Sequence, residues 1–351
     1  MSLPSSRPTF SDPEALQATE QGVALFDQSD WGRFEIVGDG SLDFLHNQST
    51  NDLKNLQLGQ GGETIFITPT AGIVDLVSLY RTGSDQTLIL TSPQRRKMVE
   101  STLCRFLVFL KGVELKDRAP DTVTFRLVGP AAADLLHHLG WPDLTSSPPW
   151  CHHVVALESA SIQVLLGSDS HQYTLIAPMA WGEKLWGLMV NWGGIPASAN
   201  VWEILCLGQG RPLPDHELTD SINPLEAGLW HAVSLEKGCY VGQEVLAKQV
   251  TYQRIRQTLW GIQLPVPTAA GTAVLRDNEK IGTVTRSSLI RETALALAFI
   301  RSKAEPYPGM AVEIDQRPAQ LVKLAYLTYP PGVGEMPEPL EAVNAVETLE
   351  L

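Results

Sequence analysis

The sequence predicts an α+β protein in which two related ferredoxin-like α/β units precede a small all-β barrel. Its 351 residues exceed the length of a typical single-core domain, so several folded units are expected. The segments RFEIVGDGSLDFLH (33–46) and TFRLVGPAAADLLH (124–137) share six identical positions, which indicates one strand–glycine–helix element used twice. After about residue 252 helical periodicity gives way to short alternating apolar runs, which are typical of a barrel.

The first part of the chain alternates helical and strand patterns. A helix is predicted over 12–27, with Asp12 as its N-cap and Pro13 at its first helical position. TLILTS (87–92) indicates a strand, and Ser92-Pro93 then opens a helix whose apolar residues fall on one face. These apolar residues are Val99, Leu103, Phe106 and Leu110.

The chain after residue 150 returns to antiparallel strands with helices on one face. Strands are predicted at 162–167 and 172–177, and helices at 178–192 and 197–207. This order is typical of ferredoxin-like layers and not of a doubly wound parallel sheet.

These patterns divide the chain. We expect an α/β region at 10–250, whose inner unit covers about 52–120, and the barrel at 256–329. Within the barrel, Asp277-Asn278 marks a hairpin, because both residue types tolerate the left-handed backbone of a two-residue turn.

Bulk composition favours a soluble, cytoplasmic protein. Apolar residues make up 44% and charged residues 19%, and no apolar run approaches the roughly 20 residues of a membrane span. The N-terminal residues resemble neither a signal peptide nor a transit peptide. A formal net charge of −13 argues against direct, tight nucleic-acid binding. Residues 330–351 carry five glutamates and no basic residue, which predicts a flexible acidic tail.

The patterns of cysteine and glycine residues argue against common metal-binding and nucleotide-binding sites. Cys104, Cys151, Cys206 and Cys239 are scattered, without a CxxC pair or zinc-ligand spacing, so reduced thiols and no protein-only metal site are expected. Neither a strand-linked GxGxxG nor a P-loop is present, so nucleotide binding has no support.

The stretch KGCYVGQE (237–244) is the most unusual in the chain. Cys239 lies between Gly238 and Tyr240, two positions after Lys237. A thiol near a cation ionises more readily, and flanking glycines leave it accessible, so a reactive nucleophile or soft-metal ligand is one interpretation. The alternative is a small apolar residue in a glycine corner.

KGCYVGQE resembles the K-G-C-Y-x-G-Q-E signature of the YgfZ family, the folate-binding, iron–sulfur-associated relatives of the glycine-cleavage T-protein, an aminomethyltransferase. The likeness spans roughly residues 20–330. Three further segments carry it: FLHNQSTNDLKNLQLGQ (44–60), AGIVDLVSLY (71–80) and NPLEAGL (223–229).

The resemblance implies a T-protein-like ring of two α/β units and a barrel, with tetrahydrofolate in the central hole and the Cys239 thiol facing that hole. It further implies a protein that supports assembly or repair of iron–sulfur enzymes, including those that modify tRNA. Iron–sulfur enzymes or assembly factors would be its partners, and Cys239 its redox or cluster-facing residue.

Candidate ligand-binding residues follow from the resemblance and from the chemistry of a pterin, which needs an apolar slot with convergent polar groups. Each also has a structural alternative: a turn cap for Asn51 and Asp52, a partnered carboxylate for Asp75, core packing for Trp230 and plain solvation for the cations. The candidates are Asn51, Asp52, Asp75, Tyr80, Gln209, Glu226, Trp230, Lys237 and Tyr240 for the slot and its surroundings, and Lys248, Arg254 and Arg256 for the glutamate tail of the folate.

Two departures from the T-protein pattern bear on activity. The T-protein pattern has a pair of adjacent aspartates, of which this chain keeps only Asp75, with Leu76 in the second position. The T-protein pattern also has a pterin-binding glutamate, and Gly208 occupies its position here. Gln209 could supply an amide hydrogen bond instead. A folate-dependent aminomethyl or one-carbon transferase with Asp75 as general base is therefore an alternative function. A scaffold that has lost both ligand and chemistry is a further one.

Overall fold

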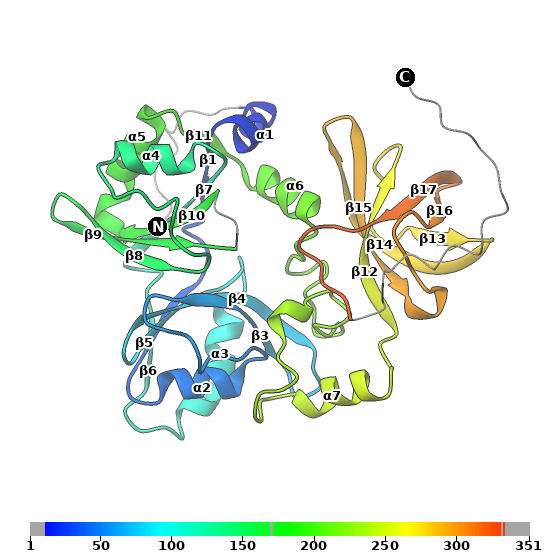
Figure 1. Cartoon of the computed structure of the whole chain (residues 1–351), viewed down its shortest axis with the longest axis horizontal. Coiled ribbons are helices and arrows are strands. Elements are labelled where there is room, and N and C mark those ends of the chain that lie inside the picture. Colours follow the sequence, from blue (N-terminus) through cyan, green and yellow to red (C-terminus); the bar gives the residue numbers. More distant parts are fainter. Residues whose placement is uncertain (1–10, 169–170, 331–332, 334–351) are drawn as a thin grey trace.

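The computed structural model describes residues 11–168, 171–330 and 333, and it consists of two α/β units and a β-barrel (Figure 1). The sheet of the first unit has the strand order β11-β1-β7-β10-β9-β8. Most neighbours are antiparallel, but β1 and β11 are parallel. Its strands are β1 (Ala24–Asp27), β7 (Thr122–Val128), β8 (His152–Leu157), β9 (Ala160–Leu166), β10 (Gln172–Pro178) and β11 (Ile195–Ala197).

The second unit is a five-stranded antiparallel sheet in the order β3-β4-β5-β2-β6. Helices α2 (Ser41–Gln48) and α3 (Arg96–Leu107) cover one face, where Val99 and Leu103 are fully buried. Its strands are β2 (Arg33–Val37), β3 (Gly61–Ile67), β4 (Ile73–Gly83), β5 (Gln86–Leu90) and β6 (Glu114–Asp117).

The barrel is closed by six strands in the order β12-β15-β14-β13-β16-β17, so none of its edges is left unpaired. Asp277 and Asn278 form the predicted hairpin, with φ of 51° and 67°. The strands are β12 (Gln257–Leu264), β13 (Ala273–Arg276), β14 (Glu279–Ile290), β15 (Thr293–Arg301), β16 (Ala311–Ile314) and β17 (Arg317–Val322).

The remaining helices link these bodies. Figure 1 shows α6 (Ala199–Gln209) between the first unit and the barrel, and α7 (Gln243–Thr251) between the second unit and the barrel. The others are α1 (Asp12–Gln21), α4 (Ala132–His138), α5 (Gly182–Asn191) and three single-turn helices at Met179–Trp181, Trp230–Ala232 and Ser302–Ala304. Among the described residues, no helix is long and apolar enough to cross a bilayer.

The repeated element predicted from sequence is present in both units. Strand β2 leads into α2 through Gly38, and β7 leads into α4 through Gly129. Both glycines have φ near 130° (126° and 136°), and a Cβ on either would collide with a backbone oxygen. Only glycine fits such a position, which explains why the match is centred on it. The predicted architecture of two α/β units followed by a closed C-terminal barrel is confirmed.

The two sheets meet through side chains of both units. Tyr80 of β4 donates a hydrogen bond to the Leu166 carbonyl of β9 at 2.8 Å. Tyr80 also packs with Leu88 and Leu90 of its own sheet against Leu165 and Ile176 of the first sheet.

Several element boundaries differ from those predicted. The helix predicted over 12–27 ends at Gln21, because the next residues form the buried strand β1 against β7, and its N-cap is Ser11 and not Asp12. The helix predicted to open at Ser92-Pro93 begins at Arg96, after Gln94 with φ of 64°.

Two predicted domain boundaries can also be compared with the structure. The sheet of the inner unit begins at Arg33, before the predicted start at residue 52. Strands β8 and β11 were not expected. Apart from Pro330 and Val333, the acidic tail expected over 330–351 lies outside the described residues.

Candidate functional site

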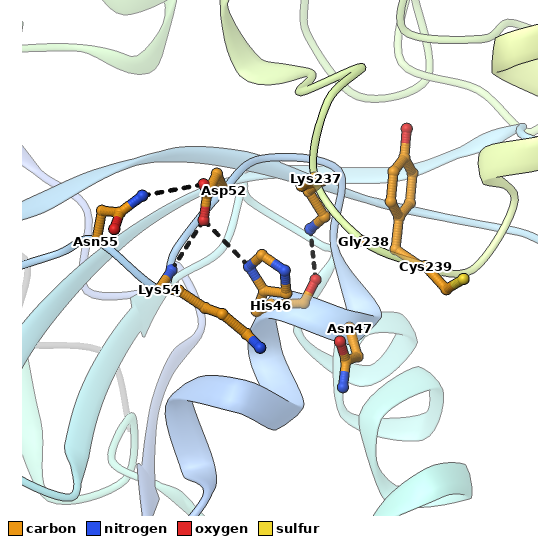
Figure 2. Close-up of a pocket in the computed structure, with 9 residues that line it drawn as sticks. His46, Asn47, Asp52, Lys54, Asn55, Lys237, Gly238 and Cys239 are labelled. Carbon is orange, nitrogen blue, oxygen red and sulfur yellow. Dashed lines mark hydrogen bonds and ion pairs between the residues drawn. The ribbon is translucent and has the colours of Figure 1, made fainter.

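Cys239 is exposed and borders an open pocket of about 770 Å³, which we call the thiol pocket (Figure 2). The pocket lies between the C-terminal end of α2, the loop that follows it and the loop that carries the cysteine. Its lining residues are His46, Asn47, Asp52, Lys54, Asn55, Lys237, Gly238, Cys239 and Tyr240.

The expected position of the thiol at the junction of three units is wrong. Among the described residues, neither the first sheet nor the barrel contributes to the thiol pocket, and Figure 2 shows the Cys239 sulfur directed away from Asp52. The second glycine of the motif, Gly242, explains the local path. It has φ of 78°, and a Cβ there would lie 2.7 Å from the Thr68 carbonyl oxygen, so this glycine is a structural corner that precedes α7.

Lys237 fixes the loop that carries Cys239. Its Nζ donates hydrogen bonds to the carbonyls of His46, Ser49 and Asn51, the latter two at 2.7 Å. Carbonyls at the end of a helix such as α2 have no partner within the helix, so a lysine satisfies them. The ammonium also lies 4.7 Å from the centre of the Tyr240 ring, and burial lowers the pKa of Lys237 to about 8.

His46 and Asp52 form the opposite wall of the thiol pocket. Their Nδ1 and Oδ1 atoms are 3.3 Å apart, and Asp52 also accepts hydrogen bonds from Asn55 and from the backbone of Lys54. Burial, followed by the charge of Lys237, lowers the pKa of His46, and its Nδ1 accepts a hydrogen bond from the Leu53 N–H at 3.3 Å. Asp52 therefore caps this turn as a hydrogen-bond acceptor.

The three cations expected at the folate tail lie in a different cavity, of about 1150 Å³, which we call the basic cleft. Lys248, Arg254 and Arg256 line it together with Glu226, whose pKa is raised by burial. Lys248 forms an exposed ion pair with Glu244 at 2.6 Å. The basic cleft shares no lining residue with the thiol pocket, so the predicted residues divide between two cavities.

Asp75 lies inside the second unit. It is 0% exposed on β4, and its Oδ2 accepts a hydrogen bond from the Ser92 backbone N–H at 2.9 Å. Within the described chain its Oδ1 has no hydrogen-bond partner. Burial raises the pKa of Asp75 to about 7. This effect of burial outweighs the hydrogen bonds from Ser92 and the charge of Arg95, which both lower the pKa.

Tyr80 and Trp230 have structural partners. Tyr80 is 3% exposed and joins the two sheets through Leu166, and the Trp230 indole N–H donates to the Leu225 carbonyl at 3.2 Å while its ring packs against a core cluster. Gly208, at the position of the missing glutamate, is exposed, and a Cβ there would face Ile290 of the barrel.

A buried ionic network that the sequence reasoning missed joins all three bodies. Glu63 of β3 accepts hydrogen bonds at 2.6 Å from Arg211, which follows α6, and from Tyr326, which follows the barrel. His231 Nε2 lies 3.4 Å from the same carboxylate. Burial alone would raise the pKa of Glu63, but Arg211, with His231 and Tyr326, lowers it to about 2.

Two of the predicted site residues, Asn51 and Gln209, form hydrogen bonds with backbone atoms of residues in this network. The Asn51 amide donates to the Glu63 carbonyl at 2.8 Å, and the Tyr326 N–H donates to the Gln209 carbonyl at 2.9 Å. Glu63 stands alone among apolar residues in GGETIFI, the same signal that singled out Asp75, so the sequence did contain a pointer to it.

A second missed group, which we call the inner polar cluster, consists of Gln28, Thr124, Arg126 and Trp202. Both amide atoms of Gln28, the Thr124 hydroxyl, the Arg126 Nε and the Trp202 Nε1 are buried without a hydrogen-bond partner among the described residues. The Arg126 guanidinium lies 4.8 Å from the centre of the Trp202 ring, and burial and Arg211 lower the pKa of Arg126 to about 10. Buried polar groups without partners are rare in proteins and indicate a place for a polar ligand or water.

The fold has the architecture of aminomethyltransferase T. A crystal structure of the glycine cleavage system aminomethyltransferase T from Bartonella henselae superposes with a TM-score of 0.80, and the match covers 90% of each chain at 18% sequence identity. At this identity the likeness shows the fold alone.

Residues 11–237 match the GCVT N-terminal domain, and the chain belongs to this family. The match ends at Lys237, so Cys239 lies two residues beyond the matched region. Aminomethyltransferases of Chlorobium chlorochromatii and Thermus thermophilus are 26% and 29% identical and are covered over 84% and 88% of their lengths.

A chloroplast protein of Arabidopsis thaliana, which carries only a provisional name as a transferase, is 35% identical over 277 residues. The match covers 78% of this chain but 64% of the Arabidopsis protein, less than two thirds of its length.

Proposed function

We propose that this chain is a YgfZ-like tetrahydrofolate-binding protein that supports the assembly or repair of iron–sulfur enzymes, including enzymes that modify tRNA. The observation that carries the proposal is the contrast between its two candidate reactive groups. Cys239 is exposed at the thiol pocket on a loop fixed by Lys237, whereas Asp75 is fully buried. An accessible thiol suits exchange with a partner protein, and a sealed carboxylate does not suit catalysis on a bound folate.

The inner polar cluster supports the folate part of the proposal. A pterin is a flat ring with several donors and acceptors, and Gln28 offers one buried donor and one buried acceptor that lack partners within the described chain. Trp202 and Arg126 add an aromatic face and a cation. These residues would hold the ring and its anionic tail, and the bound folate would supply a carrier of one-carbon units.

The thiol pocket supports the iron–sulfur part. Thiolate is the form of cysteine that binds iron or exchanges with a disulfide, and Cys239 is an exposed cysteine that borders this pocket. In this proposal the cytoplasm is the compartment, iron–sulfur enzymes or their assembly factors are the partners, and the thiol meets them at the surface.

The test is complementation of a strain with an iron–sulfur maturation defect, with activity of an iron–sulfur enzyme as the readout. We expect rescue by the wild type and loss of rescue by Cys239→Ala. Cys104→Ala is the matched control, because Cys104 is the other exposed cysteine of the described chain. Equal rescue by wild type and Cys239→Ala would remove the thiol from the mechanism.

A folate-dependent one-carbon transferase is the second candidate. It is favoured by the aminomethyltransferase names of the relatives and by Asp75, whose pKa near 7 and unpartnered Oδ1 would suit a general base if the site opens. Formation of methylene-tetrahydrofolate from an aminomethyl donor, lost in Asp75→Asn, would support it. No turnover with such a donor excludes it.

A further inference from the structure

The basic cleft concentrates positive charge on a chain whose formal net charge is −13. Its lining includes five cations and two carboxylates, those of Asp220 and Glu226. The cations come from α7, the loop that follows it, the end of β15 and the single-turn helix Ser302–Ala304, so the fold and not one run of sequence gathers them. They are Lys248, Arg254, Arg256, Arg301 and Lys303.

These five positive charges have few negative partners among the described residues. Among the residues that the structure describes, only Lys248 of the five has an ion pair, and its partner Glu244 is exposed and does not line the cleft. Arg254 stacks on the Tyr252 ring at 5.1 Å, which supplies no negative charge. All five side chains are exposed, so solvent screens them in part, but like charges that line one cavity still favour a ligand with several negative groups.

The sequence of the chain itself contains such a group of anions. Residues 331–351 contain five glutamates and no basic residue, and they follow directly on Tyr329 and Pro330. The Tyr329 hydroxyl donates to the Leu259 carbonyl at 2.8 Å, and the Leu259 N–H donates to the Glu226 carbonyl at 2.9 Å. Because Glu226 lines the cleft, these two hydrogen bonds connect Tyr329 through Leu259 to the wall of the cleft.

We propose that the acidic segment 331–351 docks in the basic cleft, where its glutamates neutralise the five cations. A random coil of 21 residues spans roughly 25 Å on average, which is enough to reach a cavity beside Tyr329 and Pro330. Tethering gives it an effective concentration in the millimolar range, so a free polyanion must bind more tightly than that to displace it. The glutamates are Glu335, Glu338, Glu341, Glu347 and Glu350.

Zero-length carbodiimide cross-linking of the full chain at low salt tests the contact directly, because it joins a carboxylate to a lysine only where they touch. Peptide mapping should show links from the acidic segment to Lys248 or Lys303, independent of protein concentration and lost in 0.5 M salt. Lys54 and Lys184 are remote controls, with side chains 56% and 46% exposed. Links to these controls at equal yield, or none to the cleft lysines, would overturn the proposal.

Displacement by inorganic tripolyphosphate gives a second readout on the folded protein. Replacing the five glutamates of the segment by glutamine should tighten binding of this probe at least tenfold, and adding Arg254→Gln and Arg301→Gln should abolish it. Equal affinity in the wild type and the five-glutamine variant would show that the segment does not occupy the cleft. The charge-matched control replaces five exposed glutamates that do not line the cleft, Glu100, Glu114, Glu183, Glu279 and Glu313. An equal gain in that control would assign the effect to net charge and contradict the proposal.

Discussion

The ammonium of Lys237 lies 2.7 Å from the carbonyl oxygen of Ser49, across a sequence separation of 188 residues. This contact, repeated at two neighbouring carbonyls, attaches the loop of Cys239 to the end of α2. The position of the thiol therefore depends on a lysine that belongs to the same sequence motif.

Lys237→Met should destabilise the protein and loosen the thiol loop. Three carbonyls lose a charged donor. Each hydrogen bond to a charged group contributes about 1.5–3 kcal/mol, but the cost of burying the ammonium offsets part of their sum, so a net loss of about 3 kcal/mol is expected. Chemical denaturation measures the change, and the alkylation rate of Cys239 should rise. Lys54→Met, at the exposed side of the same pocket, should change stability by less than about 0.5 kcal/mol. Equal effects of the two substitutions would contradict the assigned role of Lys237.

Glu63→Gln should be among the most destabilising single substitutions. It leaves the Arg211 guanidinium buried without its carboxylate, which costs about 3–5 kcal/mol. Since the folded pKa of Glu63 is about 2 and its ordinary value 4.5, the wild type gains stability above pH 4.5 that is lost as the pH falls towards 2. Urea titrations at pH 7 and pH 3.5 should show a smaller difference between wild type and variant at the lower pH. Glu114→Gln, at a side chain 72% exposed, is the control and should have little effect at either pH.

Asp75 should make stability fall with rising pH. Its pKa is about 7 in the folded chain against 3.8 ordinarily, so the folded state holds an extra proton between these values. The stabilisation is present below pH 3.8 and is lost as the pH rises through 7, by up to about 1.4 kcal/mol per pH unit. Asp75→Asn should therefore melt above the wild type at pH 8 and not at pH 4, whereas the exposed control Asp134→Asn should show no such reversal. A constant difference between wild type and Asp75→Asn at both pH values would refute this protonation.

Cys239 should be the first thiol to react in the native protein. Cys151 and Cys206 are buried, and the pKa of Cys104 is raised by partial burial and by Glu100, so its thiolate is scarce at neutral pH. Mass spectrometry after brief alkylation at pH 7.5 should find a single label on Cys239. Labelling of Cys104 ahead of Cys239 would contradict the exposure and reactivity assigned here.

The fold was predictable because its signals are local. Gly38 and Gly129 need a backbone that only glycine adopts, and Asp277-Asn278 forms the turn that its residue types favour. Helix α1 was placed too long because residues 24–27 look equally apolar in a helix or a strand, and only pairing with β7 decides between them.

The candidate site was less predictable because its contacts are distant in sequence. Glu63 and Arg211 are separated by 148 residues, and nothing near either of them indicates the other. The motif correctly drew attention to Cys239 and Lys237, but its neighbours on α2 and not the barrel form the pocket. The assignment of Lys248, Arg254 and Arg256 to a folate tail stays a prediction, since they line a separate cleft.

Calorimetric titration of the full chain with tetrahydrofolate tests the central claim most directly, with Gln28→Met as the paired variant. Because both Gln28 amide atoms are buried without partners in the part of the chain that the structure describes, we expect Gln28→Met to keep or raise the melting temperature. It should nevertheless weaken a saturable, one-to-one folate isotherm at least tenfold. No heat from the wild type at high-micromolar folate would contradict the account and leave a scaffold that has lost its ligand.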